Sequence, residues 1–593
     1  MADEPELDVL LGTERTFPPP PGFAAEAEWR DAGVYERAAA DPEGWWAGWA
    51  ERLEWIEPWH TVLDWSDPPH ARWFDGGKLN VSANCLDRHV AAGSGERVAF
   101  HWEAEDADEL GDEGRKAITY DWLLDQTQRF ANVLRGLGVK KGDVVGIFMP
   151  MVPETAVAML ACARIGAVHN VVFGGFSASS LKERMEVSEA KALVTADATL
   201  RRGAPMPMKE KVDTILGDLP DLEHVIVVNR CDTGCEMLEG RDVDWHDAVA
   251  AADPVCEPEP MDSEDPLYIL YTSGSTAKPK GIVHTTGGYL TQVAASHRMV
   301  FDLKDDDVYW CAADVGWVTG HSYIVYGPLA NGATSVMYEG APDYPGRDRW
   351  WQIIERYGVT ILYTAPTVIR SFMKWGADLL AEHDLSSLRL LGSVGEPINP
   401  RAWLWYHEHV GGGRCPIVDT WWQTETGAIM ISPLPGITTT KPGSATVPLP
   451  GIEAAIYDAE GEPIEEGGGT LVLTRPWPAM ARTLYGEPER FVETYWQRYG
   501  PATYLVGDAA QFDEDGCGGI VGRIDDVINV AGHRLSPMEV ASALGARAGV
   551  AAAAVTGGPD DAPGPAIVAF VTRRVGVEAG QGVTAVLRDP VAV

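Results

Sequence analysis

From Val144 onward the chain alternates short apolar runs, rich in β-branched residues, with helix-forming stretches, and this alternation strongly limits its fold. The first two runs are Val144–Met149 and Val168–Phe173, and the Ala-rich helical segment 154–165 lies between them. A strand that is buried on both faces is apolar along its whole length, so such runs predict parallel strands covered by helices. We therefore predict an α/β fold.

The same pattern recurs further along the chain. Strand-like runs follow at 192–195, 225–228, 308–312, 360–363 and 389–393. A chain of 593 residues is too long for one hydrophobic core, so we expect two helix-covered sheets in one large unit. Short strands separated by Pro and Gly at 443–520 predict a small β subdomain.

Three regions of unequal size are expected. Residues 1–75 are Trp-rich and predict a helical segment that covers the larger body; residues 76–524 form the large domain, and 525–593 a smaller α+β lid. Within the large domain, the acidic, Gly-containing stretch 103–116 predicts a surface loop.

One loop has the composition of a phosphate-binding site. An apolar run, 267–270, leads into small hydroxyl residues and glycine, followed by two lysines: Thr272, Ser273, Gly274, Ser275, Thr276, Lys278 and Lys280. Small side chains let backbone N–H groups approach an anion, and the ammonium groups offset its charge. The Walker A pattern is absent. Taken alone, the segment is equally consistent with an ordinary polar turn.

The order of residues in this loop resembles the nucleotide loop of the adenylate-forming enzymes, which include acyl-CoA synthetases, luciferases and peptide-synthetase adenylation domains. The following segment, 281–290, resembles the short-chain acyl-CoA synthetases of the acetyl-CoA synthetase type. Three later segments, 392–398, 419–427 and 522–534, resemble further signatures of the same family. The resemblance extends from about residue 40 to 570.

The resemblance implies an ATP site. It comprises the loop residues given above together with Gly395, Glu396, Pro397, Asp419, Thr420, Trp421, Gln423, Thr424, Asp508, Arg523 and Arg534. By the family pattern, Thr424 contacts the α-phosphate, Glu425 helps to hold Mg²⁺, and Arg534 lies near a phosphate. One carboxylate suffices for Mg²⁺, because this ion usually takes only one or two protein ligands. Asp508 is expected to accept from both ribose hydroxyls.

The resemblance also implies an acyl pocket and a CoA site. Trp422 is expected to close the pocket, with Val318, Thr319 and Val394 as its other walls. An indole there excludes longer acids, at about 1–3 kcal/mol per methylene, so acetate is favoured and propionate is expected to be slower. CoA is expected at Phe173, Gly174, Gly175 and Arg201, although Ala204 stands where related enzymes have a second Arg.

The C-terminal part departs from the family pattern. The resemblance places the hinge of the lid at Asp525, but the family's C-terminal Pro-x-Thr-x-Ser-Gly-Lys type segment is missing, and the last lysine is Lys441. We therefore expect a shortened lid, with adenylation either impaired or rescued in another way. A smaller departure is Ala277, where most related enzymes have Gly.

The charge balance limits the partners. The chain has 87 Asp and Glu against 47 Lys and Arg, a formal net charge of −40. Nucleic-acid binding needs a basic surface, so this partner is not expected. No apolar run is long enough to span a membrane and the N-terminus lacks a signal-peptide pattern, so we expect a cytoplasmic protein. Carboxylates spread along the chain predict adaptation to high salt.

The predicted function is AMP-forming ligation of acetate to CoA through an acetyl-adenylate, with Mg²⁺-ATP consumed. Two alternatives remain open: a synthetase for propionate or another short acid, and a catalytically impaired nucleotide-binding pseudo-enzyme.

Overall fold

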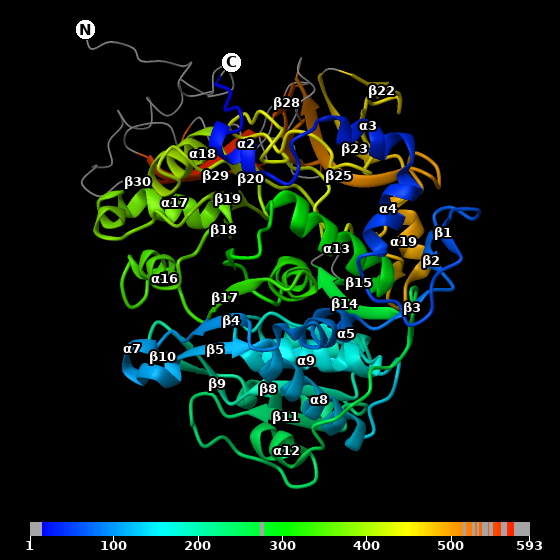
Figure 1. Ribbon diagram of the computed structural model, residues 1–593, viewed down its shortest axis with the longest axis vertical. Coiled ribbons are helices and arrows are strands. Elements are labelled where there is room, and N and C mark those ends of the chain that lie inside the picture. Colours follow the sequence, from blue (N-terminus) through cyan, green and yellow to red (C-terminus); the bar gives the residue numbers. More distant parts are fainter. Residues whose placement is uncertain are drawn as a thin grey trace.

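The structure, a computed structural model, describes residues 15–272, 278–465, 467–513, 518–524, 528–530, 533–535, 544, 550–558 and 566–573. Two large sheets with their helices lie one above the other in Figure 1, and a third, smaller sheet lies near the top. This arrangement is an α/β architecture consistent with the adenylate-forming fold.

The first large sheet has eight strands and carries the phosphate loop. Its order is β12 (Asp242–Asp244), β11 (His224–Val228), β8 (Ala192–Ala196), β6 (Val144–Phe148), β7 (Val168–Val171), β14 (Pro266–Thr272), β15 (Lys280–Thr285) and β24 (Thr483–Leu484). The strands from β12 to β14 are parallel, whereas β15 runs antiparallel to both of its neighbours. The sheet is therefore mixed, and the loop joins two antiparallel strands.

The helices of this sheet follow the predicted pattern. They include α8 (Tyr120–Gly136), α9 (Pro153–Ile165), α10 (Ala178–Val187), α11 (Lys209–Asp213) and α12 (Trp245–Ala251). Pro153 starts α9, a position where proline is favoured because the first N–H groups of a helix make no hydrogen bond within it. Gly166 ends the helix with φ 74°, a conformation that favours glycine. Helix α8 packs on α9 and on α12.

The second large sheet has seven strands. Its order is β20 (Ile417–Asp419), β19 (Leu390–Ser393), β18 (Ile361–Thr364), β16 (Val308–Cys311), β17 (Thr334–Tyr338), β4 (Val98–Glu103) and β5 (Arg115–Thr119). Only β5 is antiparallel within the sheet. Its helices include α13 (Gly287–Val300), α14 (Val318–Gly320), α15 (Gly327–Ala330), α16 (Arg349–Tyr357), α17 (Pro366–Trp375) and α18 (Pro400–Trp405).

The prediction that residues 103–116 form a surface loop is wrong. The segment contains the end of β4, helix α7 (Ala107–Leu110) and the start of β5, which pairs with β4. Glu103 is fully buried, and its Oε1 accepts from Nη1 of Arg356 at 2.6 Å. Strand β5 lies at the edge of the sheet with Lys116 and Ala117 exposed, so its sequence lacks an apolar run.

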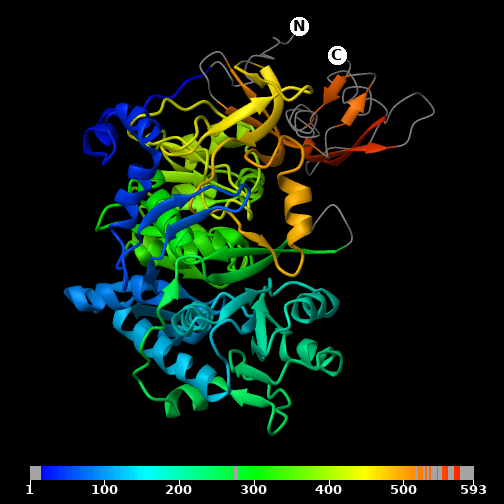
Figure 2. The ribbon, with the colours of Figure 1, turned by 90° about the vertical axis from the view of Figure 1, so that its right-hand side faces the viewer.

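The remaining parts are smaller. The third sheet is antiparallel, in the order β22 (Pro463–Ile464), β21 (Ala454–Tyr457), β23 (Gly467–Leu473), β25 (Tyr504–Phe512) and β26 (Gly518–Arg523), and α19 (Pro488–Tyr495) precedes β25. Near the N-terminus lie α2 (Pro21–Glu26), α3 (Gly33–Ala40), α4 (Pro42–Ala50) and the hairpin β1 (Thr61–Asp64) with β2 (Arg72–Asp75). In Figure 2 these helices lie on the side opposite to β29 (Val550–Gly558) and β30 (Ala566–Arg573).

Among the helices of the described residues, none combines the length and apolar character needed to cross a membrane.

Candidate active site

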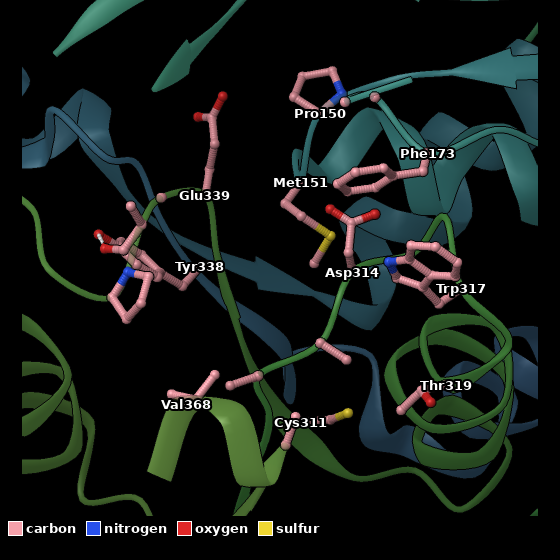
Figure 3. A pocket seen from close by; sticks show the side chains of 18 of the residues that line it. Pro150, Met151, Phe173, Cys311, Asp314, Trp317, Thr319, Tyr338, Glu339 and Val368 are labelled. Atoms are coloured by element: carbon pink, nitrogen blue, oxygen red, sulfur yellow. Dashed lines mark hydrogen bonds between the residues drawn. The ribbon is translucent and has the colours of Figure 1, made fainter. Parts of the chain in front are cut away.

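A cavity of about 720 Å³ opens where strands of both large sheets end (Figure 3). The segments that follow β6, β7, β16, β17, β18, β19 and β20 all contribute to its lining. Because the carboxyl ends of parallel strands meet at one edge of a sheet, residues that are distant in sequence converge there. Ligands of α/β proteins commonly bind in such a crevice.

The four predicted acyl-pocket residues line this cavity together: Val318, Thr319, Val394 and Trp422. The Trp422 indole lies edge-on to Tyr323, with ring centroids 5.0 Å apart and an interplanar angle of 89°. Tyr323 is held in turn, because its hydroxyl lies 2.8 Å from Oγ of Ser296 and accepts from the Ile429 N–H at 2.8 Å. This support for the indole could not be predicted from the sequence, because Tyr323 and Ser296 meet Trp422 only in the folded chain.

Two predicted nucleotide-binding residues also line the cavity next to Trp422, namely Gln423 and Thr424. Gly395 lines it as well, with φ 93°, a conformation that favours glycine. The backbone at Thr424 is fixed because its carbonyl lies 2.7 Å from Nε2 of the buried His284.

Asp508 is linked to two other predicted nucleotide-binding residues. Its Oδ2 accepts from Nε1 of Trp421 at 3.0 Å and from Nε2 of Gln423 at 3.1 Å. Arg523 approaches Oδ1 at 3.5 Å. Burial raises the pKa of Asp508 above its ordinary value. These contacts hold the carboxylate in one position.

Asp419 and Thr420 lie at the end of β20. The Thr420 hydroxyl donates to the Ser393 carbonyl at 2.7 Å and lies 2.7 Å from the Tyr363 hydroxyl. Asp419 is buried, and burial raises its pKa to about 7. A carboxyl group with this pKa is partly protonated at neutral pH.

Glu425 lies in a small polar cluster with Lys280 and Tyr495. Its Oε1 accepts from the Tyr495 hydroxyl at 2.6 Å and is 3.4 Å from Nζ of Lys280, which also lies 2.6 Å from the Tyr495 hydroxyl. Within the described part of the chain, no residue hydrogen bonds to Oε2 of Glu425. Tyr495, at the end of α19, is a member of this cluster that was not predicted from the sequence.

The residues predicted to bind CoA form another wall of the same cavity: Phe173, Gly174, Gly175 and Arg201. Phe173 lies 5.4 Å from Trp317, centroid to centroid. A Cβ on Gly175 would lie 2.5 Å from the Phe173 ring, so the close approach of backbone and ring requires glycine. Arg202, with φ 51°, is also in the lining and pairs with Asp343 at 3.1 Å.

Other predicted residues are placed differently or lie outside the described residues. Glu396 is paired with Arg370 at 3.0 Å and accepts from the Thr367 N–H at 2.7 Å, and the adjacent Pro397 is half-buried. Thr272 ends β14, and Lys278 is exposed beyond the loop. The structure does not describe Ser273, Gly274, Ser275, Thr276, Asp525 or the side chain of Arg534.

The two large sheets, the small β sheet and a mostly apolar cavity at the strand ends define an α/β protein consistent with the adenylate-forming fold. A family profile described as "AMP-binding enzyme" matches residues 87–485, and one described as "Acetyl-coenzyme A synthetase N-terminus" matches residues 32–85. The chain therefore belongs to the AMP-binding enzyme family, of the acetyl-CoA synthetase type.

Similar proteins named acetyl-coenzyme A synthetase occur in several bacteria. The chain is 61% identical to one from Rubrobacter xylanophilus, over 97% of this chain and 89% of that protein. It is 56% identical to one from Gemmatimonas aurantiaca, over 99% of this chain and 90% of that protein. It is 51% identical to one from Chlorobaculum tepidum, over 96% of this chain and 86% of that protein.

Proposed function

We propose that this protein ligates acetate to CoA, with ATP cleaved to AMP and pyrophosphate, through an acetyl-adenylate intermediate. The observation that supports this best is a single cavity lined by Trp422 from the predicted acyl pocket, Thr424 from the nucleotide site and Phe173 from the CoA site. Relatives of 51–61% identity that bear the name acetyl-coenzyme A synthetase support the same activity.

In the first half-reaction, a carboxylate oxygen of acetate attacks the α-phosphorus of ATP and pyrophosphate leaves. The Trp422 indole bounds the space for the methyl group, so the carboxylate is kept near Thr424. The Thr424 hydroxyl donates to an α-phosphate oxygen, where negative charge accumulates. Such catalysis depends on positioning and on electrostatic stabilisation, and no covalent nucleophile from the protein is needed.

Glu425 is the proposed protein ligand for Mg²⁺, which neutralises phosphate charge when bound. The donor set fits this ion, because a hard cation prefers carboxylate oxygen and usually takes few protein ligands. Tyr495 and Lys280 both contact Oε1, which leaves Oε2 without a hydrogen bond from the described residues. In this proposal they orient the carboxylate, as partners of metal ligands commonly do.

In the second half-reaction, the CoA thiol attacks the carbonyl carbon of the acetyl-adenylate, and AMP leaves with one of the original acetate oxygens. The Phe173–Gly175 segment and Arg201 guide the CoA chain along the cavity. Asp508 binds the ribose hydroxyls, and the segment Gly395–Pro397 contacts the base. We also propose a domain boundary at Asp525, about which the C-terminal part rotates between the two half-reactions.

Acetate-dependent exchange of labelled pyrophosphate into ATP tests the first half-reaction without CoA. The proposal predicts exchange that needs both acetate and Mg²⁺. Thioester formation from supplied acetyl-adenylate tests the second half-reaction separately. A protein that binds ATP but catalyses neither step is a nucleotide binder, and the proposed function is then wrong.

A further inference from the structure

Three carboxyl groups of the described residues line the cavity: Glu105, Asp314 and Glu339. Most of the remaining lining is apolar. A polar group of a ligand that enters such a space gives up its hydrogen bonds to water, so it needs a partner on the wall. A carboxyl oxygen can be that partner only if it is both accessible and unpaired.

Two of the three groups do not meet this condition. Oε1 of Glu105 accepts from the Gly203 N–H at 2.9 Å, and its Oε2 accepts from the Ala341 N–H at 3.0 Å. Oε2 of Glu339 accepts from Nε of Arg230 at 2.9 Å, and its Oε1 is enclosed by protein. Both glutamates therefore serve the packing of the cavity wall.

Asp314 is different, because one of its oxygens is accessible. The residue is half-buried, and its Oδ1 accepts from the Gly316 N–H at 2.7 Å. Oδ2 makes no hydrogen bond within the described part of the chain and is not among its enclosed polar atoms, so it keeps accessible surface. Figure 3 shows the carboxylate pointing toward the Phe173 ring, beside Trp317. Asp314 thus presents one unpaired oxygen to the cavity.

The turn that carries Asp314 lies between the predicted CoA wall and the predicted acyl pocket. A Cβ on Gly316 would lie 2.5 Å from Cα of Phe173, so this side of the turn packs directly on the CoA wall. On its other side the turn continues into α14, which begins with two residues of the predicted acyl pocket. A Cβ on Gly320, the last residue of α14, would lie 2.4 Å from the Asp314 carbonyl oxygen, so α14 folds back onto Asp314.

The charge of Asp314 selects the kind of ligand group that it can bind. Burial raises its pKa to about 6, although the Gly316 N–H and the Arg201 guanidinium act in the opposite direction. Above pH 7 the carboxyl group is therefore largely ionised and can only accept hydrogen bonds. Acetate and the phosphates of ATP are anionic and are repelled by it, so the matching group is an uncharged N–H donor.

We propose that Oδ2 of Asp314 accepts a hydrogen bond from the CoA amide N–H nearest the thiol and thereby directs the thiol toward the acetyl group. The inference rests on the proposed function and adds a binding residue to it. In CoA a short carbon chain joins this amide to the thiol, and the phosphates lie toward the other end of the molecule. Arg201, at the end of β9 (Ala198–Arg201), is the residue proposed for that other end, and Asp314 lies nearer the acyl pocket.

The test compares two variants in thioester formation from supplied acetyl-adenylate at pH 8. Asp314→Asn keeps an oxygen for the Gly316 N–H but places an NH₂ group where the amide N–H needs an acceptor. We expect kcat/KM for CoA to fall at least about tenfold, the effect of losing a hydrogen bond to a charged group. Asp265→Asn is the matched control, because Asp265 is half-buried, accepts from a backbone N–H and lies outside the cavity. It should leave kcat/KM for CoA unchanged.

Smaller thiols identify the group that Asp314 contacts. N-acetylcysteamine keeps the amide N–H next to the thiol, so Asp314→Asn should reduce its kcat/KM by the same factor as that of CoA. 1-Propanethiol has no amide and should stay within about twofold of the unsubstituted protein. Pyrophosphate exchange does not involve CoA, so its rate and the KM values for ATP and acetate should not change.

An equal fall with 1-propanethiol, a fall with CoA that is absent with N-acetylcysteamine, or no fall with CoA overturns the inference. Calorimetric binding of CoA is a second readout that needs no turnover. Binding to Asp314→Asn should be about tenfold weaker than binding to Asp265→Asn, and equal binding contradicts the contact. If the unsubstituted protein catalyses neither half-reaction, the proposed function fails, and this calorimetric comparison still decides whether Asp314 binds CoA.

Discussion

Replacing Trp422 by glycine is expected to change which acids the enzyme activates. The indole lines the cavity beside Val318, Thr319 and Val394, and it packs edge-on against Tyr323 at 5.0 Å. Removing it opens space at the end of the proposed acyl pocket while the residues proposed to bind ATP stay in place. The variant should therefore accept longer acids without losing adenylation chemistry.

The size of the effect follows from the burial of methylene groups. Each methylene transferred from water into the new space contributes about 0.8 kcal/mol, or roughly fourfold in kcat/KM. Butyrate has two more methylenes than acetate, so the ratio of kcat/KM for butyrate to that for acetate should rise at least about fifteenfold. Removal of the steric barrier should raise this ratio further, because a closed pocket disfavours an acid with one extra methylene by about 1–3 kcal/mol.

The assay measures kcat/KM for acetate, propionate, butyrate and valerate with saturating ATP and CoA. Loss of a buried Trp costs about 3–5 kcal/mol of stability, and less is expected for the half-buried Trp422. Trp405→Gly is the matched control, because Trp405 is half-buried on α18 and outside the cavity. It should lower the melting temperature without changing acid preference. An unchanged butyrate-to-acetate ratio in Trp422→Gly refutes the assignment of the acyl pocket.

Three further outcomes are expected. Tyr495→Phe removes the 2.6 Å hydrogen bond to Glu425, so the Mg²⁺ concentration for half-maximal pyrophosphate exchange should rise about tenfold; the shift in melting temperature on adding Mg²⁺ to the ATP complex should shrink in parallel. An unchanged Mg²⁺ requirement means that Tyr495 does not orient the carboxylate. Asp419 has a folded-state pKa of about 7, above its ordinary value, so the folded protein binds this proton more tightly than the unfolded chain. Its contribution to stability is therefore full below pH 3.8 and is lost as the pH rises through 7, by up to about 4 kcal/mol. The fall in melting temperature between about pH 5 and 8 should be smaller in Asp419→Asn, and equal pH profiles contradict this pKa. Because the net charge is −40, the melting temperature should rise from dilute buffer to molar KCl, and a flat or falling profile contradicts the prediction of salt adaptation.

The strands were predictable wherever both of their faces are buried. β6, β8 and β11 were predicted within one residue at each end, because nearly all of their residues are apolar. The edge strand β5 was missed for the opposite reason, since Lys116 and Ala117 face solvent. Its pairing with β4 depends on backbone hydrogen bonds, which leave no apolar run in the sequence.

The candidate site was predictable where a family signature is contiguous in sequence. Trp422 and Thr424 belong to such a signature, and both line the cavity. Tyr495 was not predictable, because its partner Glu425 is 70 residues away and the contact exists only after α19 packs.

The central claim, formation of an acetyl-adenylate in this cavity, is tested most directly by isotope transfer. With acetate labelled by ¹⁸O in both carboxylate oxygens, the account predicts that one labelled oxygen appears in the AMP produced with each thioester, and that pyrophosphate carries none. Product AMP without label, or label in inorganic phosphate accompanied by ADP, would contradict attack of acetate on the α-phosphorus and with it the proposed reaction.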